Sequence, residues 1–337
     1  MKRLLTLLRR GVTYWLPLAL LLIAALARLA VPQFLDRLSL IWFDVYQWTQ
    51  PRARGGDLSV RIVDIDDRSL KEFGQWPWPR SQVALLLDKL REAGAAIVVF
   101  DVMFSEPDRT SPRLLIPLLT GAGVARSDAE RLLATMPDPD RRLAEAIARL
   151  PVVIGFALGD SGGTAAPLQK AGFAFAAAAG ADPLRAVRSY PEAISDLPEL
   201  QRAAAGNGFV NQHLDWDNVV RRVPLLLRLG TKPVPSLAAE ALRLATGAHG
   251  YIGRAAGANT ERSFGQNSGL EALKIGPLTV PTDGAGRVWL YFAPSETDRY
   301  VSAADILAGT AEVPISTMLP EMRAPSAVPA RMSAAET

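Results

Sequence analysis

The feature that most constrains the fold is the stretch from residue 62 to residue 108, where two apolar runs flank a turn rich in tryptophan and proline. The first run, residues 60–65, is β-branched and ends in acidic residues, as expected where a buried strand reaches the edge of a sheet. Asp67 is expected to cap a short helical turn after it. The prolines of residues 76–80, WPWPR, fix φ and force each preceding tryptophan out of the helical region. The sequence therefore predicts a stiff extended link with two aromatic faces.

A helix is predicted directly after this link. Ser81 is a suitable N-cap, apolar residues follow at helical spacing, and Gly94 stands where the helix should end. The second apolar run, residues 96–100, then leads into Asp101. A strand, a helix and a strand without a hairpin turn predict a parallel, right-handed βαβ unit.

The middle of the chain continues this alternation. Asp138 is expected to start a helix, and residues 152–158 form another apolar strand. Residues 109–136, between the two repeats, are expected to be a partly helical insertion on the rim. The Gly- and Ala-rich residues 159–184 predict a loop.

Hairpins are predicted further along. Residues 208–214 and 219–229 would pair around a turn, as would residues 278–281 and 287–293, and Ser236 opens a helix. The predicted fold class is α/β, with a mixed sheet built on N-terminal parallel βαβ units and later hairpins, preceded by one transmembrane helix.

The composition limits the classes of protein that the chain can belong to. With 337 residues and 49% hydrophobic residues, it is long and apolar enough for one large core or two smaller ones. A net charge of +3 is too small to indicate nucleic-acid binding. The absence of cysteine excludes disulfides and thiolate metal sites, and fits an exported bacterial domain.

Residues 12–31 are apolar over about the twenty residues that a membrane-spanning helix needs. Four basic residues precede them, so the positive-inside rule places residues 1–11 in the cytoplasm and residues 33–309 outside it. Arg28, near the outer end, can reach the headgroups. A cleavable signal peptide is the alternative, because residues 25–27 match a cleavage site. With either a membrane anchor or a signal peptide, the rest of the chain is expected to lie outside the cytoplasm.

Several blocks of residues resemble the CHASE2 family, the extracytoplasmic sensory domain of bacterial transmembrane receptors. The resemblance covers roughly residues 40–309, and the WPWPR block is its most specific part. One departure is Asn218, where the family usually has glycine, but asparagine tolerates the same positive φ. The matching residues are Phe43 and Asp44, the segments 64–67, 69–70, 74–80, 100–101 and 104–108, and then 206–211, 215–222, 235–237, 281–286 and 300–305.

The resemblance implies a sensory or ligand-binding domain in the bacterial inner membrane, with a single membrane helix and no catalysis of its own. Family members are usually fused to an adenylate or guanylate cyclase or a kinase through further membrane helices. Residues 310–337 lack these features and are expected to be a disordered tail, so the chain is expected to be a sensor without its output domain. Signalling would then need a partner output protein or a homodimer. No cofactor and no nucleic acid are expected.

The acidic ends of the two predicted strands should meet at one edge of the sheet, where open α/β folds usually bind ligands. Carboxylates crowded there would repel one another unless an arginine or a cation neutralised them, so the alternatives are a structural acid–arginine network and a ligand or cation site. The tryptophans could pack in the core or stack on a ligand. The candidate residues are Asp64, Asp66, Asp67, Trp76, Trp78, Arg80, Asp101, Glu106 and Asp108.

Three alternatives to the sensory function remain open, and two of them are hydrolases. Residues 159–163, GDSGG, match a nucleophile elbow, in which Ser161 would act with Asp215 or Asp217 and with His249. A chymotrypsin-type order is excluded because both histidines of the chain follow this serine. Asp64 at a strand end would be the nucleophile of a phosphatase. A non-functional remnant of a receptor is the remaining alternative.

Asp217 is expected to form a surface ion pair with Arg221 and Arg222 at a hairpin. His213 and His249 have no metal-ligand spacing between them. The sequence therefore leaves the question of a metal open only at the acidic edge.

Overall fold

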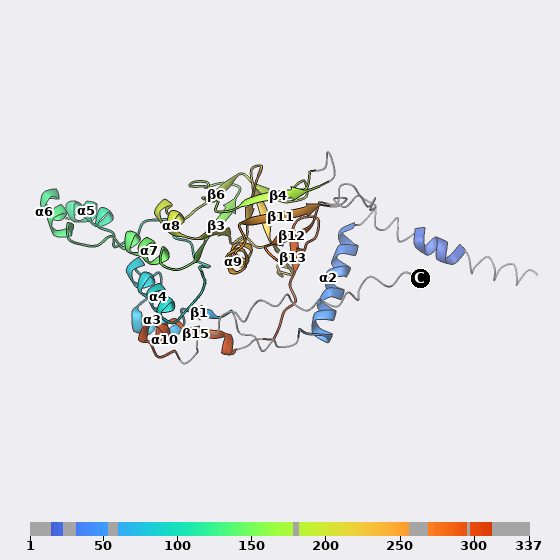
Figure 1. Ribbon diagram of the computed structural model, residues 1–337, viewed down its shortest axis with the longest axis horizontal. Coiled ribbons are helices and arrows are strands. Elements are labelled where there is room, and N and C mark those ends of the chain that lie inside the picture. Colours follow the sequence, from blue (N-terminus) through green and yellow to red (C-terminus); the bar gives the residue numbers. More distant parts are fainter. Residues whose placement is uncertain are drawn as a thin grey trace, which may run out of the picture. The chain divides into compact units, whose positions relative to one another are not determined.

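The computed structural model describes residues 15–22, 32–52, 60–177, 182–255, 269–294 and 297–311 (Figure 1). The chain divides into two compact units. The first contains Met1–Gly56 with Tyr291–Ser295, and the second contains Asp57–Leu290 with Glu296–Thr337.

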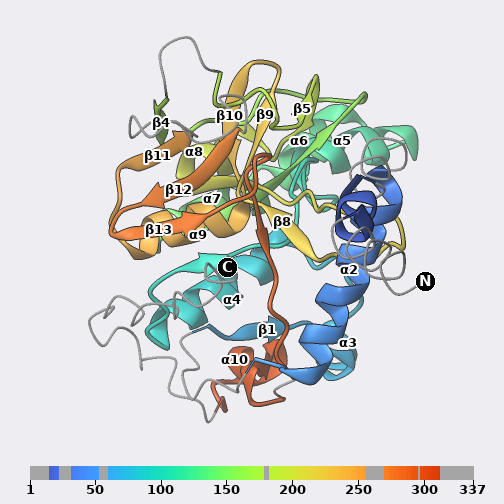
Figure 2. The same cartoon turned by 90° about the vertical axis from the view of Figure 1, so that its right-hand side faces the viewer.

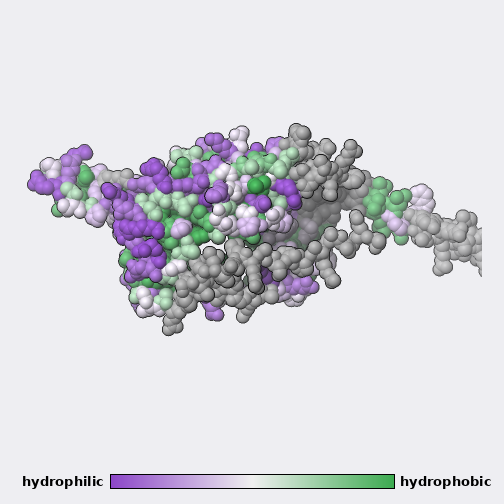
Figure 3. Space-filling model, in the orientation of Figure 1, coloured by the Kyte–Doolittle hydropathy of each residue, from purple (hydrophilic) through white to green (hydrophobic). Residues whose placement is uncertain are grey.

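The first unit is built around α2 (Pro32–Thr49), a helix with exposed aromatic side chains. The ring of Phe43 in this helix lies 5.9 Å, centroid to centroid, from that of Tyr291. Residues 15–22 form a second helical segment, whose apolar surface is green in Figure 3. No helix within the described ranges is both long and apolar enough to cross a bilayer.

Several predictions about the two ends of the chain fall on residues that the structure does not describe. The predicted transmembrane segment, residues 12–31, is described only at 15–22. Residues 1–11 lie outside the described residues, as does the predicted tail, residues 310–337, except for its first two positions. The membrane helix, its signal-peptide alternative and the disordered tail therefore stay predictions.

The second unit combines helices with short strands. In chain order its elements are β1 (Ile62–Asp64), α3 (Asp67–Phe73), α4 (Arg80–Glu92), β2 (Val98–Val99), α5 (Pro112–Gly121), α6 (Arg126–Leu133), α7 (Pro139–Ile147), β3 (Val152–Gly159), β4 (Gly172–Ala176), β5 (Ser189–Tyr190), β6 (Glu192–Ile194), α8 (Pro198–Ala203), β7 (Gly206–Phe209), β8 (Arg222–Pro224), β9 (Leu226–Leu229), β10 (Lys232–Pro235), α9 (Leu237–Ala245), β11 (Gly250–Ala255), β12 (Leu270–Ile275), β13 (Leu278–Pro281), β14 (Arg287–Trp289), β15 (Tyr300–Ser302) and α10 (Ala303–Ala308).

The first strand does not pair as the sequence predicts. β1 forms a parallel pair with β15, in which Ile62 lies opposite Tyr300 and Asp64 opposite Ser302. β2 instead pairs in parallel with β3, Val98 opposite Val152. The predicted βαβ unit joining β1 to β2 is therefore wrong, and the parallel pair that forms joins β2 to β3 through α5, α6 and α7. Figures 1 and 2 both show β1 beside α10, which directly follows β15.

The two predicted hairpins do not form as extended strand pairs. The first is present only as a single antiparallel bridge between His213 and Arg222, and the strands of both predictions pair mainly with other partners. β7 pairs in parallel with β3, and β8 pairs antiparallel with β14. β13 pairs with β12 in the sheet β13-β12-β11-β4. The last strand of this sheet, β4, lies inside the segment 159–184, which was predicted as a loop. Parallel and antiparallel pairs together make this a mixed α/β fold, as predicted.

The helices follow the sequence more closely. Asp138 caps α7 and Ser236 caps α9, each through its side chain, and Gly94 has the positive φ of a helix end, 85°. Two predicted caps are displaced by one or two residues. Asp66, not Asp67, caps α3, and α4 begins at Arg80, before the predicted cap Ser81, because Pro79 already supplies the extended backbone.

The largest apolar core is formed where α4 and α7 pack together against β3. Its fully buried side chains include Trp78, Phe104, Leu143, Ile147 and Ile154. A second core lies beneath the β11–β12 sheet and includes Tyr251 and Leu273. The first core places the Trp/Pro link and the start of α4 next to the loop that follows β2.

Candidate functional site

The candidate residues do not form one acidic edge, because β1 and β2 belong to different sheets. They separate into two hydrogen-bonded groups, one around Asp66 and one around Arg80. The remaining members, Asp64, Asp67, Trp76, Asp101 and Glu106, are exposed.

The first group joins the beginning of the unit to its end. Oδ1 of Asp66 accepts hydrogen bonds from the backbone N–H of Ser69 at 2.8 Å and from its hydroxyl at 2.6 Å. The hydroxyl of Ser302, at the end of β15, donates to the same oxygen at 3.0 Å. Ser69 is fully buried and accepts from the N–H of Ala304 at 2.9 Å. The hydrogen bonds from Ser69 and Ser302 lower the pKa of Asp66.

The second group surrounds the first residue of α4. Asp108 accepts from the backbone N–H of Arg80 and from the hydroxyl of Thr110. Its own N–H donates to Asp140, a fully buried carboxylate that lies 3.7 Å from Nε of Arg80. Although burial opposes ionisation, the hydrogen bonds from Thr110 and Arg80 lower the pKa of Asp108. This group has the form of a structural acid–arginine network.

The two tryptophans of the link have different environments. Trp78 is 2% exposed, and its indole N–H donates to the carbonyl of Gly74 at 2.8 Å. Trp76 is 38% exposed and contacts Trp78 edge to face, with 6.1 Å between ring centroids. The peptide bond between Trp76 and Pro77 is cis. Of the pair, only Trp76 has a surface that could stack on a ligand.

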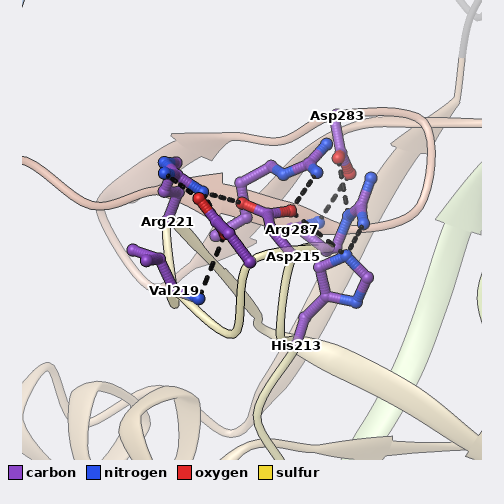
Figure 4. A network of polar contacts seen from close by, with 8 residues as sticks. His213, Asp215, Val219, Arg221, Asp283 and Arg287 are labelled. Atoms are coloured by element: carbon purple, nitrogen blue, oxygen red, sulfur yellow. Dashed lines mark hydrogen bonds and ion pairs between the residues drawn. The ribbon is translucent and has the colours of Figure 1, made fainter. Parts of the chain in front are cut away.

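A third polar network, not predicted as a site, lies between the turn at residues 215–218 and the start of β14 (Figure 4). Arg221 is 3% exposed and pairs with both Asp215, at 3.2 Å, and Asp217, at 2.6 Å. Arg222 donates to the other oxygen of Asp215 at 2.6 Å. The predicted surface ion pair is thus buried on the arginine side. Asn218 has a φ of 61°, as its place in the turn predicts.

His213 lies at the edge of this network. Its Nε2 accepts a hydrogen bond from Arg287 at 2.8 Å, and Arg287 also donates to Asp283 at 2.7 Å. Partial burial and the positive charges of Arg287 and Arg222 lower the pKa of His213. The geometry therefore favours a neutral imidazole that acts as an acceptor.

The hydrolase hypotheses find no matching geometry. Ser161 is exposed in the turn after β3, and the next element is β4, whereas a nucleophile elbow leads from a strand into a helix. Asp215 already accepts from Arg221 and Arg222, and the histidine that lies 3.7 Å from it is His213, not the His249 of the hypothesis. Asp64 ends β1, which forms a two-stranded parallel sheet with β15 and has Ser302, not a second acidic residue, opposite Asp64. In the described parts of the chain, no group of three or more histidine, aspartate or glutamate side chains could hold a metal ion.

The sequence did not single out three residues that complete these groups. Ser302 joins the first group, while Asp140 and Asp196 lie beside Arg80, and both aspartates are buried. Asp140 carries a weak local signal, since it follows the N-cap Asp138 in the first turn of α7. The others come from distant segments, so no local pattern could have identified them.

Comparison with known families agrees with the blocks that carry the resemblance. A search of curated proteins found no match, and a search of solved structures found none. The model of the CHASE2 domain matches residues 18–326, nearly the whole chain. Because this match includes both strands of the β1–β15 pair and the WPWPR link, the chain belongs to the CHASE2 family, whose members are extracytoplasmic sensory domains.

Proposed function

We propose that this chain is a membrane-anchored, extracytoplasmic sensory domain that binds a ligand and passes the signal to a separate output protein. Its family supports the sensory role. The apolar residues 12–31, with basic residues before them, support a single membrane helix with a cytoplasmic N-terminus. The output would be a nucleotide cyclase or a kinase, reached directly or within a homodimer.

One observation carries the signalling part of this proposal. The parallel pair β1–β15, fastened by the hydrogen bonds of Asp66 to Ser69 and Ser302, ties the first strand of the sensory unit to its last. A sensor whose two ends are joined can transmit a small rearrangement to both flanking segments at once. Two arrangements of this pair, populated differently with and without ligand, would supply the switch.

The ligand would contact the exposed members of the candidate set. The exposed side chains in the set, which have surface available to a ligand, are those of Asp64, Asp67, Trp76, Asp101 and Glu106. Asp66, Trp78, Arg80 and Asp108 have roles within the fold that compete with ligand contact. These four would act as supporting residues behind the contact surface.

A reporter fusion tests the proposed topology. Alkaline phosphatase, which is active only outside the cytoplasm, is joined after Gly309, the residue that ends α10. We expect high phosphatase activity from the fusion that keeps the full N-terminal segment, and none from the fusion that lacks residues 12–31. Membrane retention after carbonate extraction distinguishes an anchor from a cleaved signal peptide. Activity of a cytoplasmic reporter at the same position would refute the topology.

A chimera tests the coupling. The chain replaces the CHASE2 domain of a receptor adenylate cyclase, and cyclic AMP is measured with Asp66→Ala or Ser302→Ala. We expect both variants to change the basal cyclase output, since each removes a hydrogen bond across the β1–β15 pair. Lys71→Ala, at an exposed position of α3 outside the candidate set, is the matched control. Equal output from all four proteins would contradict coupling through this pair.

A further inference from the structure

Asp196 is a buried carboxyl group that none of the roles above uses. It lies between β6 and α8, is 3% exposed, and its Oδ1 accepts a hydrogen bond from the backbone N–H of Phe104. The adjacent N–H of Leu197 donates to the carbonyl of Phe104 at 3.0 Å. Oδ2 of Asp196 is buried and has no hydrogen-bond partner among the described residues. Such an unpaired carboxylate oxygen is costly to bury.

The charges around Asp196 do not balance. Arg80, from α4, is the nearby cation, and its guanidinium lies 4.4 Å from the centre of the Phe104 ring. The same guanidinium also faces Asp108, from the loop after β2, and Asp140, from α7. Its Nε is buried and makes no hydrogen bond to any residue that the structure describes. One arginine therefore serves three buried carboxyl groups.

The three carboxyl groups differ in the number of hydrogen bonds that stabilise their ionised forms. Asp108 accepts several hydrogen bonds, and Asp140 accepts from the N–H of Asp108 and the hydroxyl of Ser111. Within the described ranges, the carboxyl group of Asp196 accepts one hydrogen bond, from the N–H of Phe104. Burial raises the pKa of Asp196 to about 7, against the opposing effects of the Phe104 N–H and Arg80. A proton taken up by this group would therefore be held on Asp196, at Oδ2.

We propose that Asp196 is a proton-binding switch, which holds the loop after β2 against the start of α8 when protonated and favours its release when ionised. Protons are then one stimulus to which this domain responds. The switch itself depends only on the contacts around Phe104. The statement that it responds to acidity outside the cytoplasm rests on the proposed function.

The sign of the effect follows from linkage. The pKa is higher in the closed state than the ordinary value of 3.8 expected when the loop opens, so the closed state binds more protons between these values. Closure is thus favoured below pH 3.8 and progressively lost as the pH rises through about 7. Within that window the opening equilibrium should rise up to about tenfold per pH unit, the limit for one proton.

Hydrogen exchange of the full chain tests this switch. Peptides that cover residues 102–108 are followed by mass spectrometry from pH 5.5 to pH 8.5, with rates corrected for the intrinsic effect of pH. We expect the corrected exchange to increase at least tenfold over this range in the wild type. Asp196→Asn, which keeps a neutral side chain of the same shape, should exchange equally at every pH. Asp160→Asn, an exposed carboxyl, should behave as the wild type.

Histidine is the other side chain that titrates in this range. The chain has two histidines, His213 and His249, so the double variant His213→Gln/His249→Gln should keep the transition. If Asp196→Asn fails to fold, the double histidine variant is still informative. A pH transition of hydrogen exchange with an unchanged midpoint in that variant supports Asp196 as the titrating group. A wild-type exchange rate that is flat between pH 5.5 and pH 8.5, or a transition that disappears with the histidines, would overturn the proposal. A topology result against export would leave the switch intact and remove only its extracytoplasmic stimulus.

Discussion

The hydroxyl of Ser302 donates a hydrogen bond of 3.0 Å to Oδ1 of Asp66, although the two residues are 236 positions apart in the chain. Asp66 uses the same oxygen to cap α3 through the N–H of Ser69. One carboxylate therefore both starts a helix and fastens the last strand of the domain to the first. The sequence predicted a helix cap one residue later, at Asp67, and did not predict the fastening.

Loss of this carboxylate should weaken the domain. Asp66→Ala removes the cap of α3 and the acceptor for Ser302, and we expect the free energy of unfolding to fall by about 1–2 kcal/mol. Asp67→Ala, in the first turn of the same helix, is exposed and should change it by less than about 0.5 kcal/mol. Urea unfolding of both variants measures the difference. Equal midpoints would show that the cap contributes nothing.

The two tryptophans of the WPWPR link should differ sharply. Trp78→Ala opens a cavity in the main core, and we expect a loss of about 3–5 kcal/mol in unfolding free energy. Trp76→Ala removes a partly exposed ring and should cost about 1 kcal/mol or less. Thermal unfolding by circular dichroism compares them. A larger effect at Trp76 than at Trp78 would contradict the packing.

Gly208, in β7, lies against the start of α9. A Cβ at this position would stand 2.5 Å from Cα and N of Leu237, which are backbone atoms. Gly208→Ala should therefore force a strand or a helix to move, at a cost of about 1–3 kcal/mol. Gly172→Ala is the matched control, because a Cβ there has no neighbour within 4 Å. Similar unfolding midpoints for the two variants would refute this close approach.

Asp217 should make the stability depend on pH at the acidic end. Hydrogen bonds from Arg221 lower the pKa of Asp217 to about 2, below its ordinary value of 3.8. Its contribution is thus fully present above pH 3.8 and is lost as the pH falls towards 2. The melting temperature of Asp217→Asn should lie below that of the wild type at pH 5 and approach it near pH 2. A constant difference between pH 5 and pH 2 would show that the charge of Asp217 is not responsible.

The local parts of the fold could be predicted because they depend on neighbouring residues. Ser236 and Asp138 cap the helices expected of them, Gly94 ends α4, and Asn218 takes a positive φ in its turn. Each of these features depends on backbone angles and hydrogen bonds within a few residues. The same reasoning placed the strands near β1, β2 and β3 with small errors at their ends.

The candidate site was predicted less well, for a reason that lies in the strand pairing. We expected the carboxylates after β1 and β2 to meet because strands joined by one helix usually lie in one sheet. The pairing of β1 with β15 separates Asp66 from Asp108 and gives each a different set of partners. Asp140 and Asp196 then join Arg80 from segments that no local pattern connects to it.

The sequence by itself determined the family of this protein, the positions of most helices and the aromatic character of the Trp/Pro link before α4. Only the tertiary structure decided which strands pair, which tryptophan is buried and which carboxyl groups share Arg80. Helix caps and turns are formed between residues that are close in the chain. Strand partners and buried charges depend on contacts between distant segments, whose free energy is set by the whole packed core.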